Sequence, residues 1–244
     1  MKVISWFTSK QNWKKPGFWI VVYVGLRCLT VFCREYGFTL FKKVLKGEHV
    51  FLTGAGSGIG RLMAIKLGQQ GCKLSLSDIN MAGLEETKSI LLKNGVPIEN
   101  ICIFICDVSL KQSITDAASI ARAAFGTVTM LINNAGIVSG KTTLELTEPM
   151  VKKTFDVNTI SHLWTIKEFL PEMIAKKKGH IVSIASMAGL VSMPMLGDYC
   201  ASKFGAVAID EAVRLELKKN GHYGYIKTTC ICPYFINTGM FDGA

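Results

Sequence analysis

Short hydrophobic runs alternate with longer amphipathic stretches from Glu48 to the end of the chain. Runs that end near Gly, Asp or Asn predict strands at 50–53, 73–77, 101–105, 128–132, 180–185 and 226–232. The stretches between them predict helices at 61–70, 81–94, 109–125, 148–176 and 198–219. Because the strands are apolar throughout, they indicate a parallel sheet covered by helices on both faces. The predicted fold class is α/β, a doubly wound parallel sheet forming a single domain over residues 48–244.

Residues 1–47 follow a different pattern. An apolar run of 17 residues, Gly17 to Cys33, is broken only by Arg27 and has Lys14, Lys15 and Arg34 at its ends. Its length predicts an N-terminal hydrophobic helix that anchors the chain to a membrane, either across the bilayer or in its interface. A buried terminal helix and a cleaved signal peptide are the alternatives, although no small-x-small cleavage site follows the run.

The net charge of +10 is concentrated in this leader. Residues 1–48 hold nine Lys/Arg against two Glu, a net charge of +7, which leaves +3 for the other 196 residues. Basic residues around an apolar run favour an anionic membrane surface. No basic and aromatic platform accompanies them, so the sequence predicts no nucleic-acid partner.

The eight cysteines form no Cys-x-x-Cys pair, and four of them lie in strand-like apolar runs. A free cysteine in such a run behaves as a small hydrophobic residue, so we expect no metal site and no disulfide framework. Several free thiols indicate a domain that faces the cytosol.

A glycine-rich turn joins the first predicted strand to the first helix. Gly54, Gly56, Gly58 and Gly60 would let phosphate oxygens approach the backbone at the N-terminus of that helix. Their spacing departs from the strict G-x-G-x-x-G pattern, and a flexible loop without a ligand is the alternative. Asp78 follows the second strand, where a carboxylate can accept both ribose hydroxyls and repel a 2′-phosphate. NAD is therefore preferred over NADP, unless Asp78 is only a helix N-cap.

Tyr199 and Lys203 are four residues apart in the last predicted helix. This spacing places both side chains on one face, where the lysine ammonium would favour the phenolate and lower the pKa of the tyrosine. A tyrosine in that state can act as a general base near neutral pH. The alternative is a solvated helix face without chemistry.

Several motifs, taken together, resemble the short-chain dehydrogenase/reductases over about residues 48–242. They are Thr53-Gly54-x3-Gly58-Ile59-Gly60, Asn133-Asn134-Ala135-Gly136, Asn158, Ser186 and Tyr199-x3-Lys203. The resemblance implies a Rossmann-type sheet and four catalytic residues. Tyr199 would be the acid/base and Ser186 would stabilise the substrate oxygen. Lys203 would hold the nicotinamide ribose, and Asn158 would anchor a proton-relaying water. Ser183 is the alternative serine, but it lies within a strand rather than at its end.

The resemblance also implies a nucleotide site, with NAD preferred and NADP as the alternative. Within it, Asp107 and Val108 would contact the adenine. The implied cofactor-binding residues are Thr53, Gly54, Ser57, Gly58, Ile59, Gly60, Asp78, Asp107, Val108, Asn133, Ala135, Gly136, Tyr199, Lys203, Pro233, Ile236 and Thr238.

The segments 198–205 and 226–241 resemble the branch with epidermal retinol dehydrogenases, retinol dehydrogenase 10 and lipid-droplet 17-beta-hydroxysteroid dehydrogenases. This branch implies hydride transfer between NAD(P) and a lipophilic alcohol, ketone or aldehyde. It also implies a membrane-associated protein at the endoplasmic reticulum or lipid droplet, and is compatible with a homodimer. The family continues beyond the position of Ala244, so we expect the C-terminal part of the fold to be missing. A catalytically impaired nucleotide-binding or regulatory protein without a substrate lid is the alternative.

Overall fold

The computed structural model describes residues 44–236 of the 244-residue chain. The expected leader helix and Thr238 lie outside this range. None of the helices within residues 44–236 has the length and apolar character needed to cross a bilayer.

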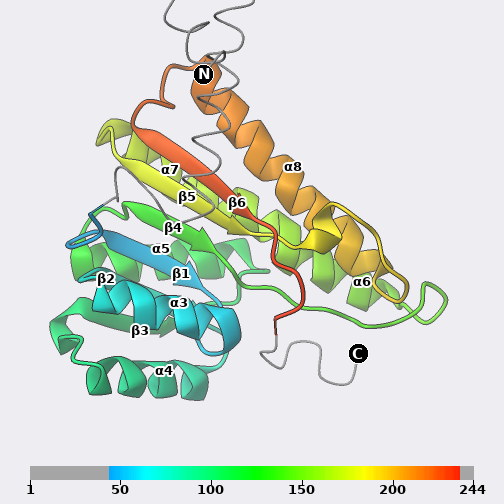
Figure 1. Cartoon of the computed structure of the whole chain (residues 1–244), viewed down its shortest axis with the longest axis horizontal. Helices are drawn as coiled ribbons and strands as arrows, with labels where there is room; N and C mark the ends of the chain where they lie inside the picture. The colour runs from blue at the N-terminus through cyan, green and yellow to red at the C-terminus, as the bar shows by residue number, and fades with distance from the viewer. Residues whose placement is uncertain (1–43, 237–244) are drawn as a thin grey trace, which may run out of the picture. The chain divides into compact units, whose positions relative to one another are not determined.

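Six parallel strands form one sheet, as the sequence pattern predicts (Figure 1). The strands are β1 His49–Thr53, β2 Lys73–Asp78, β3 Ile101–Ile105, β4 Met130–Asn133, β5 Gly179–Ile184 and β6 Ile226–Ile231. Their order across the sheet is β3-β2-β1-β4-β5-β6. The order reverses between β1 and β4, and such a reversal opens a crevice at the carboxyl ends of the strands. The predicted Rossmann-type fold is confirmed.

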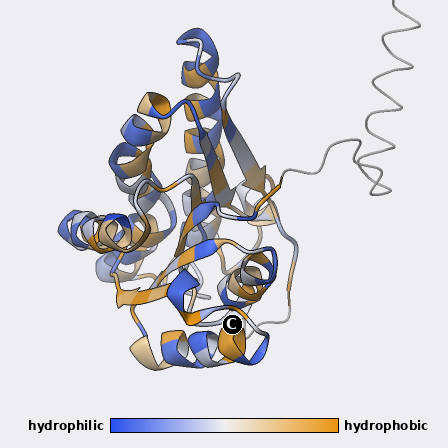
Figure 2. Cartoon of the chain, turned by 90° about the vertical axis from the view of Figure 1, so that its left-hand side faces the viewer, coloured by the Kyte–Doolittle hydropathy of each residue, from blue (hydrophilic) through white to orange (hydrophobic). Residues whose placement is uncertain are grey.

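The helices form two layers around the sheet (Figure 1). They are α3 Gly58–Gln69, α4 Met81–Lys93, α5 Lys111–Phe125, α6 Glu148–Phe155, α7 Ser161–Ala175 and α8 Gly197–Lys219. Three short helices, η2 Ile98–Asn100, η3 Asp156–Ile160 and η4 Met187–Gly189, lie between them. One core packs α3 and α4 against the sheet, and the other packs α5, α7 and α8 against its opposite face. Each helix carries both hydrophobic and hydrophilic residues, as amphipathic helices over a sheet require (Figure 2).

Two details differ from the predicted elements. The single helix expected at 148–176 is interrupted by a π-helical turn, η3, which directs Val157 and Asn158 into the interior. Periodicity alone does not reveal such a turn, because it inserts only one residue into a helical pattern. The helix expected at 109–125 begins at Lys111, as α5, and has Leu110 as its N-cap. The Ser109 hydroxyl donates to the Asp107 carboxylate at 2.6 Å, since a charged acceptor forms the stronger bond.

One buried histidine makes the stability of the fold depend on pH. His162 of α7 is 1% exposed, and neither ring nitrogen has a hydrogen-bond partner among residues 44–236. Burial, with a smaller effect of Lys203, lowers the pKa of His162 from 6.5 to about 3. The unfolded chain therefore binds a proton that the folded chain excludes as pH falls from 6.5 towards 3. Stability falls over this window by about 1 kcal/mol per pH unit.

We expect His162→Leu to remove most of this acid sensitivity. Urea unfolding at pH 7 and pH 5 should show that the wild type loses about 2 kcal/mol more than the variant between the two values. His222→Gln is the control, because His222 is partly exposed and bonded to the Tyr225 hydroxyl. An equal loss in the wild type and in His162→Leu would contradict the assignment.

Candidate active site

A cavity of about 640 Å³ opens at the carboxyl ends of the strands. Its walls come from the turn between β1 and α3, the ends of β2 to β5, the start of α8 and the segment after β6. The volume lies within the range of small-molecule and cofactor sites. It is the crevice that the strand order predicts.

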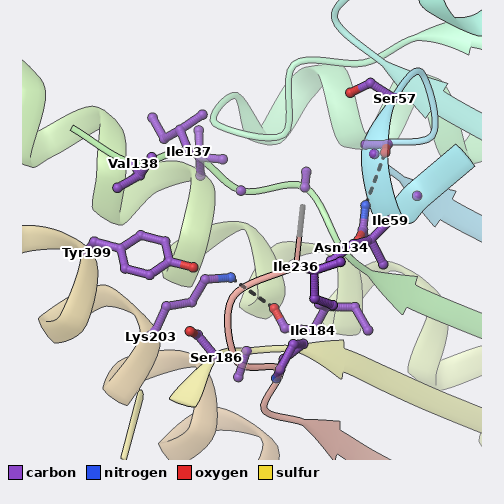
Figure 3. A pocket seen from close by; sticks show the side chains of 18 of the residues that line it. Ser57, Ile59, Asn134, Ile137, Val138, Ile184, Ser186, Tyr199, Lys203 and Ile236 are labelled. Atoms are coloured by element: carbon purple, nitrogen blue, oxygen red, sulfur yellow. Dashed lines mark hydrogen bonds between the residues drawn. The ribbon is translucent and has the colours of Figure 1, made fainter. Parts of the chain in front are cut away.

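The β1–α3 turn has a backbone that only glycine fits. Gly54 has a φ of +68°, and a Cβ there would lie 2.9 Å from the Ala135 backbone. A Cβ at Gly60 would overlap the Gly54 carbonyl oxygen. The Asn134 amide donates to the Thr53 carbonyl at 2.9 Å and to the Gly54 carbonyl at 3.1 Å, and it fixes the turn. Figure 3 shows the bond to Gly54. The bare backbone and the N-terminus of α3 thus face the cavity, which suits a phosphate group.

Two polar side chains of the motifs lie behind this turn rather than in the cavity. The Thr53 hydroxyl accepts hydrogen bonds from the backbone N–H groups of Asn134 and Ala135, both at 3.0 Å. Asn133 accepts a hydrogen bond from the Thr165 hydroxyl at 2.7 Å. Both residues are buried, at 2% exposure. They join β1, β4 and α7 beneath the cavity floor and do not line it.

Asp78 faces the glycine turn from the end of β2. Its two carboxylate oxygens accept the backbone N–H groups of Gly56 at 2.9 Å and Asn80 at 3.0 Å. Asn80, not Asp78, is the N-cap of α4, since its side chain accepts the Gly83 N–H. The interpretation of Asp78 as a helix cap is therefore wrong, and its carboxylate lines the cavity.

Asp107 and Lys153, which both line the cavity, form an ion pair. Lys153 of α6 donates to Asp107 at 2.9 Å and to the Ser109 hydroxyl at 2.6 Å. Burial tends to raise the pKa of Asp107, but hydrogen bonds from Ser109 and Lys153 hold it below its ordinary value. The sequence did not single out Lys153, because the partners are 46 residues apart.

Tyr199, Lys203 and Ser186 converge at the other end of the cavity (Figure 3). Tyr199 and Lys203 are 4% and 3% exposed, and the Lys203 Nζ lies 5.8 Å from the centre of the Tyr199 ring. The Lys203 Nζ donates to the Ile184 carbonyl at 2.9 Å. Ser186 caps η4 through the Ala188 N–H at 3.1 Å, and its hydroxyl is hydrogen-bonded to Tyr199. The tyrosine–lysine pair is thus a buried site and not a solvated helix face.

The expected effect of Lys203 on Tyr199 is not found. Burial raises the pKa of Tyr199, and the hydrogen bond with Ser186 offsets only part of that rise. Burial also lowers the pKa of Lys203 from 10.5 to about 8. Desolvation, and not the charge of the neighbouring side chain, is the largest effect on both groups.

Asn158 lies behind the cavity wall, completely buried. Its Oδ1 accepts the Ile137 N–H at 2.9 Å, and its Nδ2 donates to the Ile137 carbonyl at 2.9 Å and the Ser202 hydroxyl at 3.0 Å. The Ser202 hydroxyl in turn donates to the Tyr199 carbonyl at 2.7 Å. Asn158 therefore ties the wall segment at Ile137 to the helix that carries Tyr199.

The comparison with known sequences agrees with this geometry. The family described as short chain dehydrogenase matches residues 48–244. The chain belongs to this family.

Curated short-chain dehydrogenases support the assignment. Epidermal retinol dehydrogenase 2 of Homo sapiens is 46% identical over 202 residues, which cover 83% of this chain and 64% of that protein. Estradiol 17-beta-dehydrogenase 11 of Mus musculus is 43% identical over 219 residues, which cover 88% and 72% of the two chains. The chain thus spans slightly less than two thirds of the retinol dehydrogenase it matches.

Solved short-chain dehydrogenase structures share the fold. A Burkholderia phymatum short-chain dehydrogenase/reductase in complex with NAD has a TM-score of 0.77 and 34% identity, covering 82% of this chain and 70% of that one. A metagenomic short-chain oxidoreductase in complex with NADP has a TM-score of 0.71 and 28% identity, covering 78% and 84%.

Most of the sequence-predicted site residues of this short-chain dehydrogenase share the one cavity. Those that line it are Gly54, Ser57, Gly58, Ile59, Gly60, Asp78, Asp107, Val108, Ala135, Gly136, Ser186, Tyr199, Lys203, Pro233 and Ile236. Thr53, Asn133 and Asn158 lie behind its walls, and Thr238 lies outside the described residues. The cavity also contains residues that the sequence analysis did not select. They are mostly apolar and include Ile137, Val138, Met193 and Phe235. Their position after the carboxyl ends of β4, β5 and β6 was the available signal.

Proposed function

We propose that this chain is an NAD(P)-dependent oxidoreductase acting on a lipophilic alcohol, ketone or aldehyde, such as a retinoid, steroid or fatty alcohol. The observation that carries the proposal is the convergence of Tyr199, Ser186 and Lys203 in a cavity whose other end is the glycine turn. Membership of the short-chain dehydrogenase family supports it. The residues present fit a dinucleotide, because the turn exposes bare backbone and Asp78 offers a carboxylate.

Each polar side chain of the site has a distinct task in this proposal. The nicotinamide, when bound, supplies or accepts the hydride. Ser186 donates a hydrogen bond to the substrate oxygen and holds it at the Tyr199 hydroxyl. Tyr199 gives its proton to that oxygen in reduction and takes the proton in oxidation. Its raised pKa keeps the proton on the hydroxyl. Tyr199 is therefore in the protonation state that donates a proton to the substrate oxygen during reduction.

Lys203 is mainly an ammonium at neutral pH, since its pKa is about 8. In this proposal Lys203, which lines the cavity, holds the nicotinamide ribose, as the family resemblance implies. Asn158 holds the cavity wall through Ile137, and its expected role in anchoring a relay water stays a prediction.

The substrate class rests on the apolar part of the cavity. Ile137 and Val138 lie at the end that holds Tyr199 (Figure 3), and Met193 packs with Val138 against the Tyr199 cluster. Phe235 lines the same cavity, and the polar groups at this end are Ser186, Tyr199 and Lys203. An apolar pocket with a few polar groups orients an apolar molecule through one oxygen. The names of the relatives, a retinol dehydrogenase and an estradiol dehydrogenase, agree with this class.

NAD preference is proposed from Asp78, and Asp78→Ala tests it. A 2′-phosphate near this carboxylate would be repelled, so the variant should lower the ratio of kcat/KM for NAD over NADP by about tenfold. The two nucleotides are compared at saturating alcohol. Glu85→Ala, which removes an exposed carboxylate that pairs with Lys88 on α4, is the control. An unchanged ratio in Asp78→Ala would refute the role of Asp78.

The proposal includes a membrane anchor at residues 1–47, a catalytic domain at 48–244 and a location at the endoplasmic reticulum or lipid droplet. The apolar and basic pattern of the leader supports it. Membrane fractions washed with carbonate should retain the full chain and release a chain that begins at Glu48. A homodimer is compatible with the proposal and is tested by light scattering.

The decisive experiment measures NADH formation with purified protein, NAD and a panel of retinol, estradiol and long-chain alcohols. Turnover of at least one of them above the uncatalysed rate is expected. Nucleotide binding without turnover in either direction would favour the regulatory alternative.

A further inference from the structure

Two cysteine thiols lie together behind the active site. Cys230 is in β6 and Cys232 follows the end of that strand, and their Sγ atoms are 4.0 Å apart. Residues at positions i and i+2 of an extended segment point to the same face. The register pairs Thr228 with Ile181 and Cys230 with Ser183, which places the thiols on the face that α8 covers. Both cysteines are half-buried and free.

The thiols adjoin the proposed catalytic machinery without lining the cavity. Both sulfur atoms are close enough to Lys203 to affect its pKa. Pro233, the residue after Cys232, lines the cavity, and its carbonyl accepts the Met187 N–H at 2.9 Å. Within residues 44–236, β6 is the last strand of the sheet and pairs with β5 (Figure 1).

The separation of the sulfur atoms suits a bridging atom better than a direct bond. A disulfide needs the sulfurs at about 2.05 Å, which would force the backbone of β6 to bend. Trivalent arsenic binds sulfur in a pyramid, so two sulfurs bonded to it lie closer together than the observed 4.0 Å but farther apart than in a disulfide. A bridge therefore needs a smaller inward shift of the two side chains than a disulfide does.

The environment of the two thiols favours an uncharged ligand that bonds to only two sulfur atoms. No group of three or more metal-binding side chains exists within the described part of the chain, so a zinc ion would lack protein ligands here. The Lys203 ammonium would also repel a divalent cation. Burial and the neighbouring Cys232 raise the pKa of Cys230 to about 12, so the Cys230 thiol is neutral at pH 7.

We propose that Cys230 and Cys232 form a dithiol site for trivalent arsenicals of the type R–As=O. One arsenic–sulfur bond forms to each cysteine, and the arsenic–oxygen bonds break. The oxygen leaves as water with the two thiol protons, and arsenic stays in its trivalent state. The adduct is uncharged and bridges the end of β6, directly before the Pro233 segment of the cavity. We also expect the bound arsenical to stop turnover, and this consequence rests on the proposed function. Formation of the adduct does not depend on it.

The test uses the full chain and phenylarsine oxide, with intact-mass and peptide-mapping mass spectrometry as the readout. One equivalent should add, with loss of two free thiols, and the adduct should map to the peptide with Cys230 and Cys232. Excess 2,3-dimercaptopropanol should remove it and excess 2-mercaptoethanol should not. The second thiol binds intramolecularly, so C230S and C232S should each weaken apparent affinity by roughly 100-fold or more.

Two matched controls locate the site. C102S removes a half-buried thiol of β3, and C28S/C33S removes the two leader thiols, so both variants should bind as the wild type does. Undiminished adduct in C230S/C232S, or its loss in C28S/C33S, would overturn the proposal. Circular dichroism of C230S/C232S must match the wild type, and a single variant, C232S, replaces it if the double variant does not fold. Because mass is measured directly, the result stands even if no substrate is turned over.

Discussion

Tyr199→Phe should reduce kcat by about 10³-fold while leaving the dissociation constant of the nucleotide within about twofold of the wild type. The variant keeps the ring, which is 4% exposed and packs with Ala188, Leu196 and Cys200. It removes only the hydroxyl that meets Ser186 in the cavity. If this hydroxyl carries the proton to and from the substrate oxygen, its removal leaves hydride transfer without an acid or base. Steady-state turnover and fluorescence titration of NADH measure the two quantities.

Tyr225→Phe is the matched control for this change. The Tyr225 hydroxyl is bonded to His222 just before β6 and does not line the cavity. Its removal should leave kcat unchanged. Turnover of Tyr199→Phe close to the wild-type rate would rule out Tyr199 as the acid/base, even if the chain proves to be an oxidoreductase.

Gly60→Ala should abolish nucleotide binding and destabilise the domain. A Cβ at this position would overlap the Gly54 carbonyl oxygen and lie 2.7 Å from the Asn134 amide nitrogen. The first of these neighbours is backbone, so the clash cannot be relieved by a side-chain rotation. The glycine turn would open, and the Asn134 hydrogen bonds that hold it at Thr53 and Gly54 would be lost. We expect a loss of affinity of at least about 100-fold and a lower Tm.

Gly224→Ala is the control, because a Cβ there meets no atom within 4 Å. Thermal unfolding and NADH titration of both variants separate a local effect from general intolerance of the longer side chain. Wild-type nucleotide affinity in Gly60→Ala would show that the glycine turn is not the nucleotide cradle. Equal losses in both variants would show that the effect is not specific to the turn.

The two predictions rest on different kinds of information in the chain. The glycine turn is encoded locally, since strand, turn and helix follow one another from His49 to Gln69. Tyr199 and Lys203 are encoded by helical spacing. The approach of Ser186 to Tyr199, by contrast, needs β5 and α8 to pack together. A known family resemblance, and not the spacing itself, was the reason to select that serine.

Three motif residues that were predicted to bind the cofactor or to act in catalysis do not line the cavity. Thr53, Asn133 and Asn158 are buried and bind the backbone or a helix behind the walls. A sequence motif cannot distinguish a side chain that contacts a ligand from one that supports the contacting segment. Both kinds occur at the same strand ends, and only the direction of each side chain separates them.

The sequence by itself determined the six-stranded parallel sheet, the glycine turn at its centre and the helical pairing of Tyr199 with Lys203. These features follow from short-range patterns, because periodicity and glycine placement act over a few neighbouring residues. Only the tertiary structure decided that burial raises the pKa of Tyr199, that Lys153 pairs with Asp107, and that Cys230 and Cys232 face α8. Desolvation and long-range contact depend on which elements pack together, and no local pattern specifies that packing.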